Sequence, residues 1–184
     1  MKKTIAMASA IFMFIACSSP KTDDKAAATV DSAVAAPAKP QPTEIGDPKY
    51  VDVGKSGNAA LSSGNIDAWM SSFSDNAVYI WNNGDSLAGK PAITAYWKQR
   101  RGNVIDSISF SMDIWLSVKV NQPQNAAHLP GNWLLGWYLT KAKYKTGKSM
   151  AQWIHTAMHF DGNDKIDRVV QFLDRAPINA AAKK

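Results

Sequence analysis

Large apolar residues recur along the chain with one spacing before Gly102 and with a different spacing after it. Before Gly102 they recur every three or four residues, which is typical of one face of a helix. The clearest stripe is Ile66, Trp69, Met70 and Phe73. With the proline start signals at Pro48 and Pro91, the pattern predicts helices over about 47–62, 66–73 and 91–101. Val78-Tyr79-Ile80-Trp81 predicts a short strand between the second and third helices.

After Gly102 apolar and polar residues alternate, which is typical of strands with one buried and one wet face. In the first predicted strand, about 108–120, every even position is apolar, and Trp115 is the apolar exception among the odd ones. Three further strands are predicted over about 133–143, 150–160 and 166–174. In the first of these three, one predicted face carries Trp133, Leu135, Trp137 and Leu139. Helices followed by an antiparallel meander indicate an α+β domain.

The first 17 residues resemble the leader of a bacterial lipoprotein. Met1-Lys2-Lys3 is positively charged, Thr4 to Ala16 is uncharged and apolar, and Cys17 follows Ala16 as in a lipobox. The alternative is an ordinary secretory leader with an incidental cysteine. The resemblance implies that residues 1–16 are a signal peptide and that Cys17 is lipidated. The protein would then lie in the bacterial cell envelope, on the periplasmic or surface face of a membrane, held only by its lipid.

The segment 17–45 differs in composition from the rest of the chain. After Cys17 it consists mainly of Ala, Pro, Ser and charged residues and contains no aromatic residue. Such a segment cannot bury enough apolar surface to offset the entropy lost on ordering. We therefore expect a disordered tether over 17–45, a folded domain over 46–176 and a flexible tail over 177–184.

Charge and cysteine content exclude several classes of function. The 184 residues carry a formal charge of +6, and loss of Lys2 and Lys3 with the leader leaves 19 cationic against 15 anionic residues, or +4. The sequence contains no run of Lys or Arg of the kind that would predict nucleic-acid binding. The single cysteine excludes a disulfide framework and multi-cysteine metal sites. No phosphate loop or nucleotide motif is present, so we expect no cofactor. Seven tryptophans are unusual for this length and predict either a core or a cavity lining.

Five stretches in a fixed order resemble the nuclear-transport-factor-2-like fold, and in particular its SnoaL-like branch. They are Gly64-Asn65-Ile66-Asp67-Ala68-Trp69, Phe73-Ser74-Asp75-Asn76-Ala77-Val78, Gly89-Lys90-Pro91-Ala92-Ile93, Lys165-Ile166 after a Gly/Asn/Asp turn, and the closing Gln171-Phe172-Leu173-Asp174. The resemblance covers 47–176. It implies three N-terminal helices packed on a curved antiparallel sheet, a cone with an apolar cavity, and often a dimer. Members include ketosteroid isomerases, polyketide cyclases, dehydratases and proteins without catalytic activity, so the fold does not decide the function.

The resemblance also locates the positions at which relatives hold catalytic groups. Where ketosteroid isomerases have a carboxylate base, an oxyanion-hole tyrosine and a protonated aspartate, this chain has Trp81, Gly57 and Thr156. Where SnoaL-like cyclases have an acid/base aspartate, it has Gln171. Neither a proton acceptor nor the usual oxyanion donors are retained at these positions.

These positions instead predict a binding pocket. By alternation along the strands, a set of aromatic and uncharged polar side chains is expected to point into the cone: Tyr79, Trp81, Trp133, Trp137, Thr156 and Gln171. Such a lining suits a small apolar or ring-shaped ligand. The alternative is that the tryptophans fill the cone and leave no cavity.

The histidines offer a second hypothesis. His155 and His159 share a strand face, and Asp174 is the only carboxylate that the predicted strand order brings near them. His155 and Asp174 could form an acid–base pair on an unknown substrate, or lie in a dimer interface. Two histidines without a third ligand do not make a zinc site, and we expect no metal. By alternation the same odd face carries Trp115 and Trp153 beside His155, which predicts a homodimer through this face.

Overall fold

This computed structural model describes residues 39, 41–125 and 128–183. The predicted leader, the lipidation site Cys17 and all but the last residues of the predicted tether lie outside these ranges. The described helices are α1 (Lys49–Ser63), α2 (Ile66–Met70), α3 (Lys90–Gln99), the π-helical turn η1 (Arg100–Val104) that continues α3, and α4 (Arg175–Ala182). The strands are β1 (Thr43–Ile45), β2 (Phe73–Trp81), β3 (Ser86–Ala88), β4 (Ile105–Val120), β5 (Gly131–Tyr144), β6 (Ser149–Phe160) and β7 (Ile166–Phe172).

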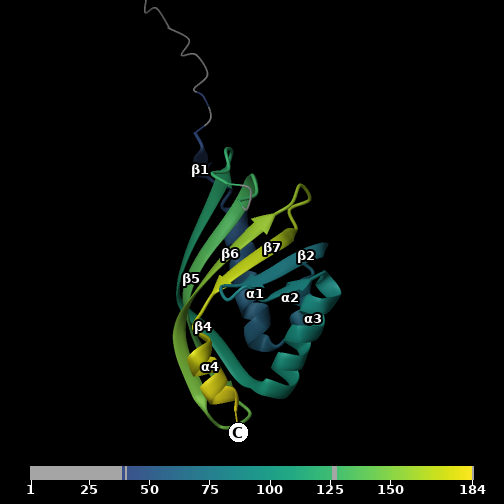
Figure 1. Cartoon of the computed structure of the whole chain (residues 1–184), viewed down its shortest axis with the longest axis vertical. Coiled ribbons are helices and arrows are strands. Elements are labelled where there is room, and N and C mark those ends of the chain that lie inside the picture. Colours follow the sequence, from purple (N-terminus) through teal and green to yellow (C-terminus); the bar gives the residue numbers. More distant parts are fainter. Residues whose placement is uncertain (1–38, 40, 126–127, 184) are drawn as a thin grey trace, which may run out of the picture. The chain divides into compact units, whose positions relative to one another are not determined.

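The strands form one curved sheet, and α1, α2 and α3 lie together on one side of it (Figure 1). The strand order is β1-β4-β5-β6-β7-β2-β3, and β4 to β7 are the expected antiparallel meander. The α+β class is therefore confirmed. One detail differs: β2 pairs with β7 in parallel, so the sheet is mixed rather than wholly antiparallel.

Both boundaries predicted for the domain need correction. β1 lies within the predicted tether and pairs residue by residue with the end of β4, from Thr43 opposite Val120 to Ile45 opposite Val118. At the other end, the predicted flexible tail is mostly helix α4, which begins after Asp174. The Asp174 carboxylate caps this helix by accepting a hydrogen bond from the Ala176 backbone N–H at 2.8 Å. Figure 1 shows α4 at the end of the sheet away from β1.

A bulge in β4 reverses the faces of that strand. Its register shifts between Ser111 and Ile114, and Met112 has a left-handed φ of 52°. One extra residue moves every later side chain to the opposite face. Ile114 and Leu116, predicted to be buried, are therefore exposed. The prediction that all even positions of this strand share one buried face is wrong beyond the bulge.

Trp115 consequently lies on the inner face rather than the outer one. Its indole fits between Gly54 of α1 and Gly136 of β5, where a Cβ atom would lie 2.8 Å and 2.3 Å from ring carbons. Only glycine allows an approach this close. Gly54 lowers helix propensity in α1, but it creates the space into which this tryptophan packs.

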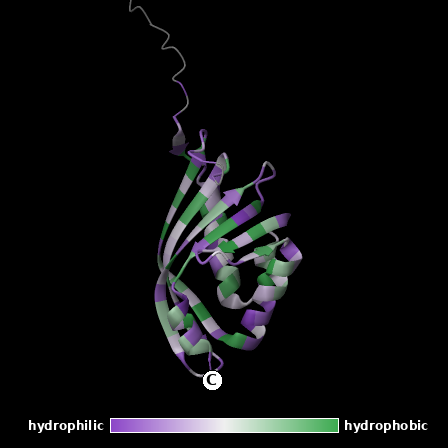
Figure 2. Ribbon diagram, in the orientation of Figure 1, coloured by the Kyte–Doolittle hydropathy of each residue, from purple (hydrophilic) through white to green (hydrophobic). Residues whose placement is uncertain are grey.

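The inner face of β5 is also opposite to the predicted one. From Leu134 to Tyr144 the even residues of β5 are buried, whereas Trp137 lies on the outer face; Trp133, also at an odd position, is buried near the start of the strand. Figure 2 shows hydrophobic and hydrophilic residues alternating along β4 to β7, as expected for strands with two different environments. No helix within the described part of the chain is long and apolar enough to cross a bilayer.

Candidate functional site

A cavity lies between the inner face of the sheet and the helices α1, α3 and α4. Its volume is about 120 Å³. For comparison, an apolar cavity of about 150 Å³ in another protein holds one benzene molecule. The cavity therefore has room for a single ring rather than for a fused polycyclic skeleton.

Four of the six predicted pocket residues line this cavity: Tyr79, Trp81, Thr156 and Gln171. Gly57, which replaces the oxyanion-hole tyrosine of ketosteroid isomerases, lines it as well. Trp133 and Trp137 do not, because the register of β5 turns odd residues outward. Trp133 donates its indole N–H to the Leu129 carbonyl at 2.9 Å, and Trp137 stacks on His155.

The wall formed by α3 and β2 is aromatic. The Trp81 ring lies 4.9 Å from Tyr79 and 5.2 Å from Tyr96, and Trp97 lies 5.3 Å from Trp69. Rings tilted or edge-on at such distances hold one another in position. Tyr96 and Trp97 were not predicted as pocket residues, and the sign available in the sequence was two consecutive aromatic residues near the end of the helix predicted over 91–101.

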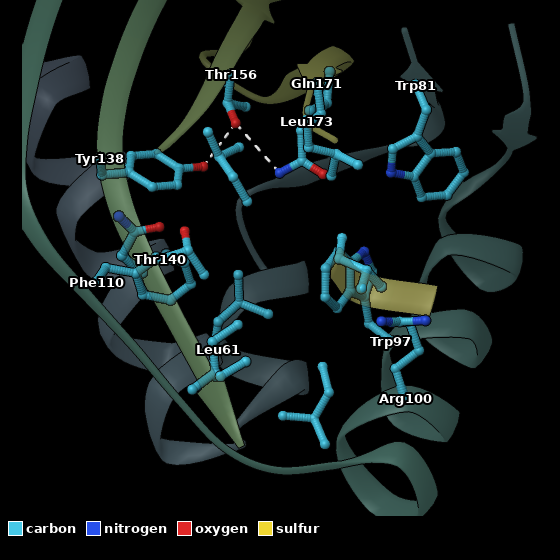
Figure 3. A pocket seen from close by; sticks show the side chains of 18 of the residues that line it. Leu61, Trp81, Trp97, Arg100, Phe110, Tyr138, Thr140, Thr156, Gln171 and Leu173 are labelled. Carbon is cyan, nitrogen blue, oxygen red and sulfur yellow. Dashed lines mark hydrogen bonds between the residues drawn. The ribbon is translucent and has the colours of Figure 1, made fainter. Parts of the chain in front are cut away.

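A chain of hydrogen-bonding side chains crosses the upper end of the cavity in Figure 3. The hydroxyl oxygens of Tyr138 and Thr156 are 2.6 Å apart, and the Gln171 amide N–H donates to the Thr156 hydroxyl at 3.4 Å. Burial raises the pKa of the Tyr138 hydroxyl, although hydrogen bonds to Thr156 and Gln171 oppose this effect. The group is therefore neutral at physiological pH. It can donate or accept a hydrogen bond, but no member of the chain is a carboxylate or an imidazole.

Arg100 and Arg175 are the only charged residues that line the cavity within the described chain. Arg175 makes a salt bridge to the Asp85 carboxylate at 2.7 Å, and its guanidinium lies 5.5 Å from the Trp81 ring centre. Arg100 is half-buried, lies 5.6 Å from the Tyr96 ring centre and makes no salt bridge to any described carboxylate. Burial raises the pKa of Tyr79 well above its ordinary value, and the positive charge of Arg100 opposes this shift.

Two buried polar atoms in residues that line the cavity lack a hydrogen-bond partner among the described residues. They are the Trp97 indole nitrogen and the Thr140 hydroxyl oxygen. An unsatisfied buried polar group costs about 1–3 kcal/mol. Figure 3 shows Trp97 and Thr140 on opposite sides of the cavity. Arg100, Trp97, Tyr138 and Thr140 were not predicted as site residues.

The predicted pair of His155 and Asp174 does not form. His155 is on the outer face of the sheet, where its Nδ1 lies 3.0 Å from the Gly136 carbonyl and its ring stacks between Trp137 and Phe172. The Asp174 carboxylate caps α4 instead. The carboxylate that contacts a histidine is Asp167, whose Oδ1 lies 2.6 Å from His159 Nδ1. The described residues contain no group of three His, Cys, Asp or Glu side chains able to hold a metal ion.

No family model matches the chain, and no curated protein matches it. Solved structures do match. An NTF2-like protein of unknown function from Burkholderia pseudomallei has a TM-score of 0.58 at 9% identity, over 73% of this chain and 97% of its own. A protein with a ketosteroid isomerase-like fold from Catenulispora acidiphila, in complex with trimethylamine, has a TM-score of 0.52 at 13% identity, over 71% and 92%. An LEH-like epoxide hydrolase from Mycobacterium tuberculosis has a TM-score of 0.51 at 11% identity, over 72% and 87%. The fold is therefore nuclear-transport-factor-2-like, as the sequence predicted, and at these identities the likeness carries no activity over.

Proposed function

We propose that the domain binds a small ring-shaped, largely apolar ligand in the cavity and does so without catalysing a reaction. The observation that carries this proposal is the lining: a single-ring volume of about 120 Å³ walled by aromatic side chains with a few polar groups. Binding sites for small molecules combine apolar walls with a small number of such orienting groups.

The absence of an acid–base group from the described lining supports binding rather than isomerisation or cyclisation. Both reactions need a group that takes and returns a proton near neutral pH. The positions that hold such groups in relatives are Trp81, Thr156 and Gln171 here, and all three side chains border the cavity. The hypothesis of an enzyme based on His155 and Asp174 loses its support, because no hydrogen bond or ion pair joins them in the described chain.

The SnoaL-like domain would act as a lipid-anchored module of the bacterial cell envelope. This part of the proposal rests on Cys17 at the end of the apolar leader. Cys17→Ala is expected to abolish acylation and to release the protein from the membrane fraction. A Cys17→Ala protein that stays with membranes, together with mature wild-type protein lacking any acyl mass, would contradict the anchor.

A homodimer through the outer face of the sheet is also part of the proposal. Large apolar side chains are exposed on this face in three strands, namely Ile114 and Leu116 of β4, Trp153 of β6 and Phe172 of β7. Apolar surface of this kind is commonly covered by a partner.

The binding proposal is tested on the purified full chain. Native mass spectrometry would detect a co-purified small molecule, and calorimetric titration would measure binding of single-ring compounds. Gln171→Ala should lower the affinity for ligands with a polar substituent while leaving the melting temperature nearly unchanged. If no single-ring compound binds and none co-purifies, the cavity has no binding role and the proposal is wrong.

A further inference from the structure

The charges that border the cavity are all positive. Arg100 and Arg175 line it, and its lining within the described chain contains no Asp, Glu or His. The other polar groups of the lining are neutral: hydroxyls, the indole N–H groups of its tryptophans, and the amides of Asn58, Gln171 and Asn179. A low-dielectric site with cations and no anion favours a negatively charged ligand and disfavours a positively charged one.

The two arginines differ in what already neutralises them. Arg175 is bound to the Asp85 carboxylate. The Arg100 guanidinium lies over the Tyr96 ring, and its positive charge opposes the rise in the pKa of Tyr144 that burial causes. Neither tyrosine supplies a negative charge at neutral pH. Arg100 is therefore the cation in this wall whose charge no described carboxylate balances.

The next residue, Arg101, shows that bordering the cavity without a partner is not a general property of the arginines in this segment. Arg101 donates its guanidinium hydrogens to the carbonyls of Leu61, Ser62 and Ile105, so its function is to join α1 to the start of β4. Arg100, one residue earlier, borders the cavity instead. Guanidinium groups bind carboxylates through two parallel hydrogen bonds, a geometry that a lysine cannot provide.

Trp97 adds a second, independent observation. It lies three positions before Arg100 and also lines the cavity, and its indole N–H is buried without a partner among the described residues. An indole N–H can only donate a hydrogen bond, so the group that would satisfy it is an acceptor. Figure 3 shows Trp97 and Arg100 on the same side of the cavity, facing Phe110 and Thr140.

Resting on the proposed binding function, we infer that the ligand is a single-ring carboxylate. Its ring occupies the aromatic part of the cavity, whose volume of about 120 Å³ is close to that of a cavity that holds one benzene ring. Its carboxylate lies against the half-buried Arg100, with Trp97 as an additional donor. The ligand's carboxylate stays at the end of the cavity beside the partly exposed Arg100, so the ligand need not be fully desolvated.

The test uses three single-ring probes of similar size and different charge: benzoate, benzamide and benzylamine. Each is titrated calorimetrically into the purified full chain at neutral pH. Because a hydrogen bond to a charged group contributes about 1.5–3 kcal/mol, benzoate should bind at least about ten-fold more tightly than benzamide. Benzylamine should bind most weakly.

Variants then locate the charge. Arg100→Gln should remove the preference for benzoate and leave the affinity for benzamide within about three-fold, since the aromatic contacts remain. Arg100→Lys should keep only part of the preference. Lys98→Gln is the matched control, because it removes a nearby cation of α3. Lys98 is paired with Asp67 at 2.7 Å and does not line the cavity. This variant should leave all three affinities unchanged.

The outcomes separate this inference from the proposal on which it rests. If benzamide binds the wild-type chain as tightly as benzoate, the carboxylate inference is wrong and the binding function stands. If no probe binds, both are wrong. If Arg100→Gln retains the full preference, Arg100 is not the anion site. Should that variant fail to fold, as judged by circular dichroism, the wild-type series and Arg100→Lys decide the question.

Discussion

Tyr138 and Thr156 connect β5 to β6 inside the cavity through hydroxyl oxygens that lie 2.6 Å apart. Thr156 also accepts a hydrogen bond from the Gln171 amide of β7. Three neighbouring strands are thus linked by polar side chains within an aromatic enclosure. In such surroundings a hydrogen bond is strong and a missing partner is costly.

This link predicts coupling between the two hydroxyls. Tyr138→Phe and Thr156→Val should each lower the free energy of unfolding by about 1–3 kcal/mol, because each removes the short hydrogen bond between the two buried hydroxyls. The double variant should lose about 1 kcal/mol less than the sum of the single variants. Urea unfolding followed by tryptophan fluorescence measures all three, and strictly additive effects would show that the two hydroxyls act independently.

Trp81 and Trp137 should respond differently to truncation, because only Trp81 borders the cavity. Trp81→Ala is expected to cost about 3–5 kcal/mol of stability, as for other large buried residues. Trp137→Ala removes mainly the stack on His155, whose ring centre is 4.6 Å away, and should cost less.

Ligand affinity separates the two positions further. Trp81→Phe should weaken benzamide binding, since the cavity loses part of its wall, whereas Trp137→Ala should leave it unchanged. A folded Trp137→Ala variant that no longer binds would mean that the outer face of β5, and not the inner one, carries the site.

The face of β5 could not be derived from the alternation of its residues. Trp133, Leu135, Trp137 and Leu139 form an apolar series at odd positions, but the even positions Leu134, Tyr138 and Ala142 are apolar too. Period 2 separates two faces and does not say which is inside. Cross-strand pairing resolves this, because Tyr138 opposes Ile154 and Gly136 opposes Thr156. Partners on paired strands share a face, so the correct hairpin register would have placed the even residues inward.

Most of the helices and long strands were predictable from apolar spacing, whereas β1, β3, α4 and the bulge in β4 were not. The helix predicted over 66–73 ends at Met70, and Phe73, counted in its stripe, begins β2 instead. The reversal at Met112 depends on the fit of Trp115 between Gly54 and Gly136, which are far from it in the sequence. The resemblance to relatives located four cavity residues: Gly57, Trp81, Thr156 and Gln171. Counting from shared motifs gives these positions even where alternation along a strand does not say which face is inside. Arg100 resembled an ordinary cation at a helix end, and only the tertiary arrangement reveals the cavity beside it.

The exposed apolar face predicts how assembly responds to mutation. Trp153→Ser together with Leu116→Ser should convert a dimer to a monomer, because both side chains are substantially exposed in the single chain. Their exposure also means that folding should be little affected. Light scattering at high micromolar concentration measures the mass, and Ala95→Ser, at an exposed position of α3, is the control. A monomeric wild-type chain under these conditions would contradict the homodimer.

A polar cluster joins the start of α1 to the turn between β6 and β7. The Asp164 carboxylate accepts hydrogen bonds from Lys49 Nζ at 2.8 Å and from the Tyr50 hydroxyl at 2.5 Å. The Lys49 bond, followed by the Tyr50 bond, lowers the pKa of Asp164 below its ordinary value. Asp164 has a left-handed φ of 58°, a conformation that asparagine also tolerates. Asp164→Asn is therefore a substitution that removes the charge without straining the backbone.

This cluster predicts a loss of stability in acid. A carboxyl group whose pKa is lower in the folded state stabilises the protein above its unfolded pKa of about 3.9, and this contribution disappears as the pH falls through the folded value. Asp164→Asn should accordingly be less stable than wild type at neutral pH, and the difference should shrink as the pH falls below about 4. Urea midpoints measured across this range test the prediction, with Asp52→Asn of α1 as the matched loss of a carboxylate. If the wild-type and Asp164→Asn midpoints keep a constant separation throughout, the Lys49–Asp164 interaction does not contribute to stability.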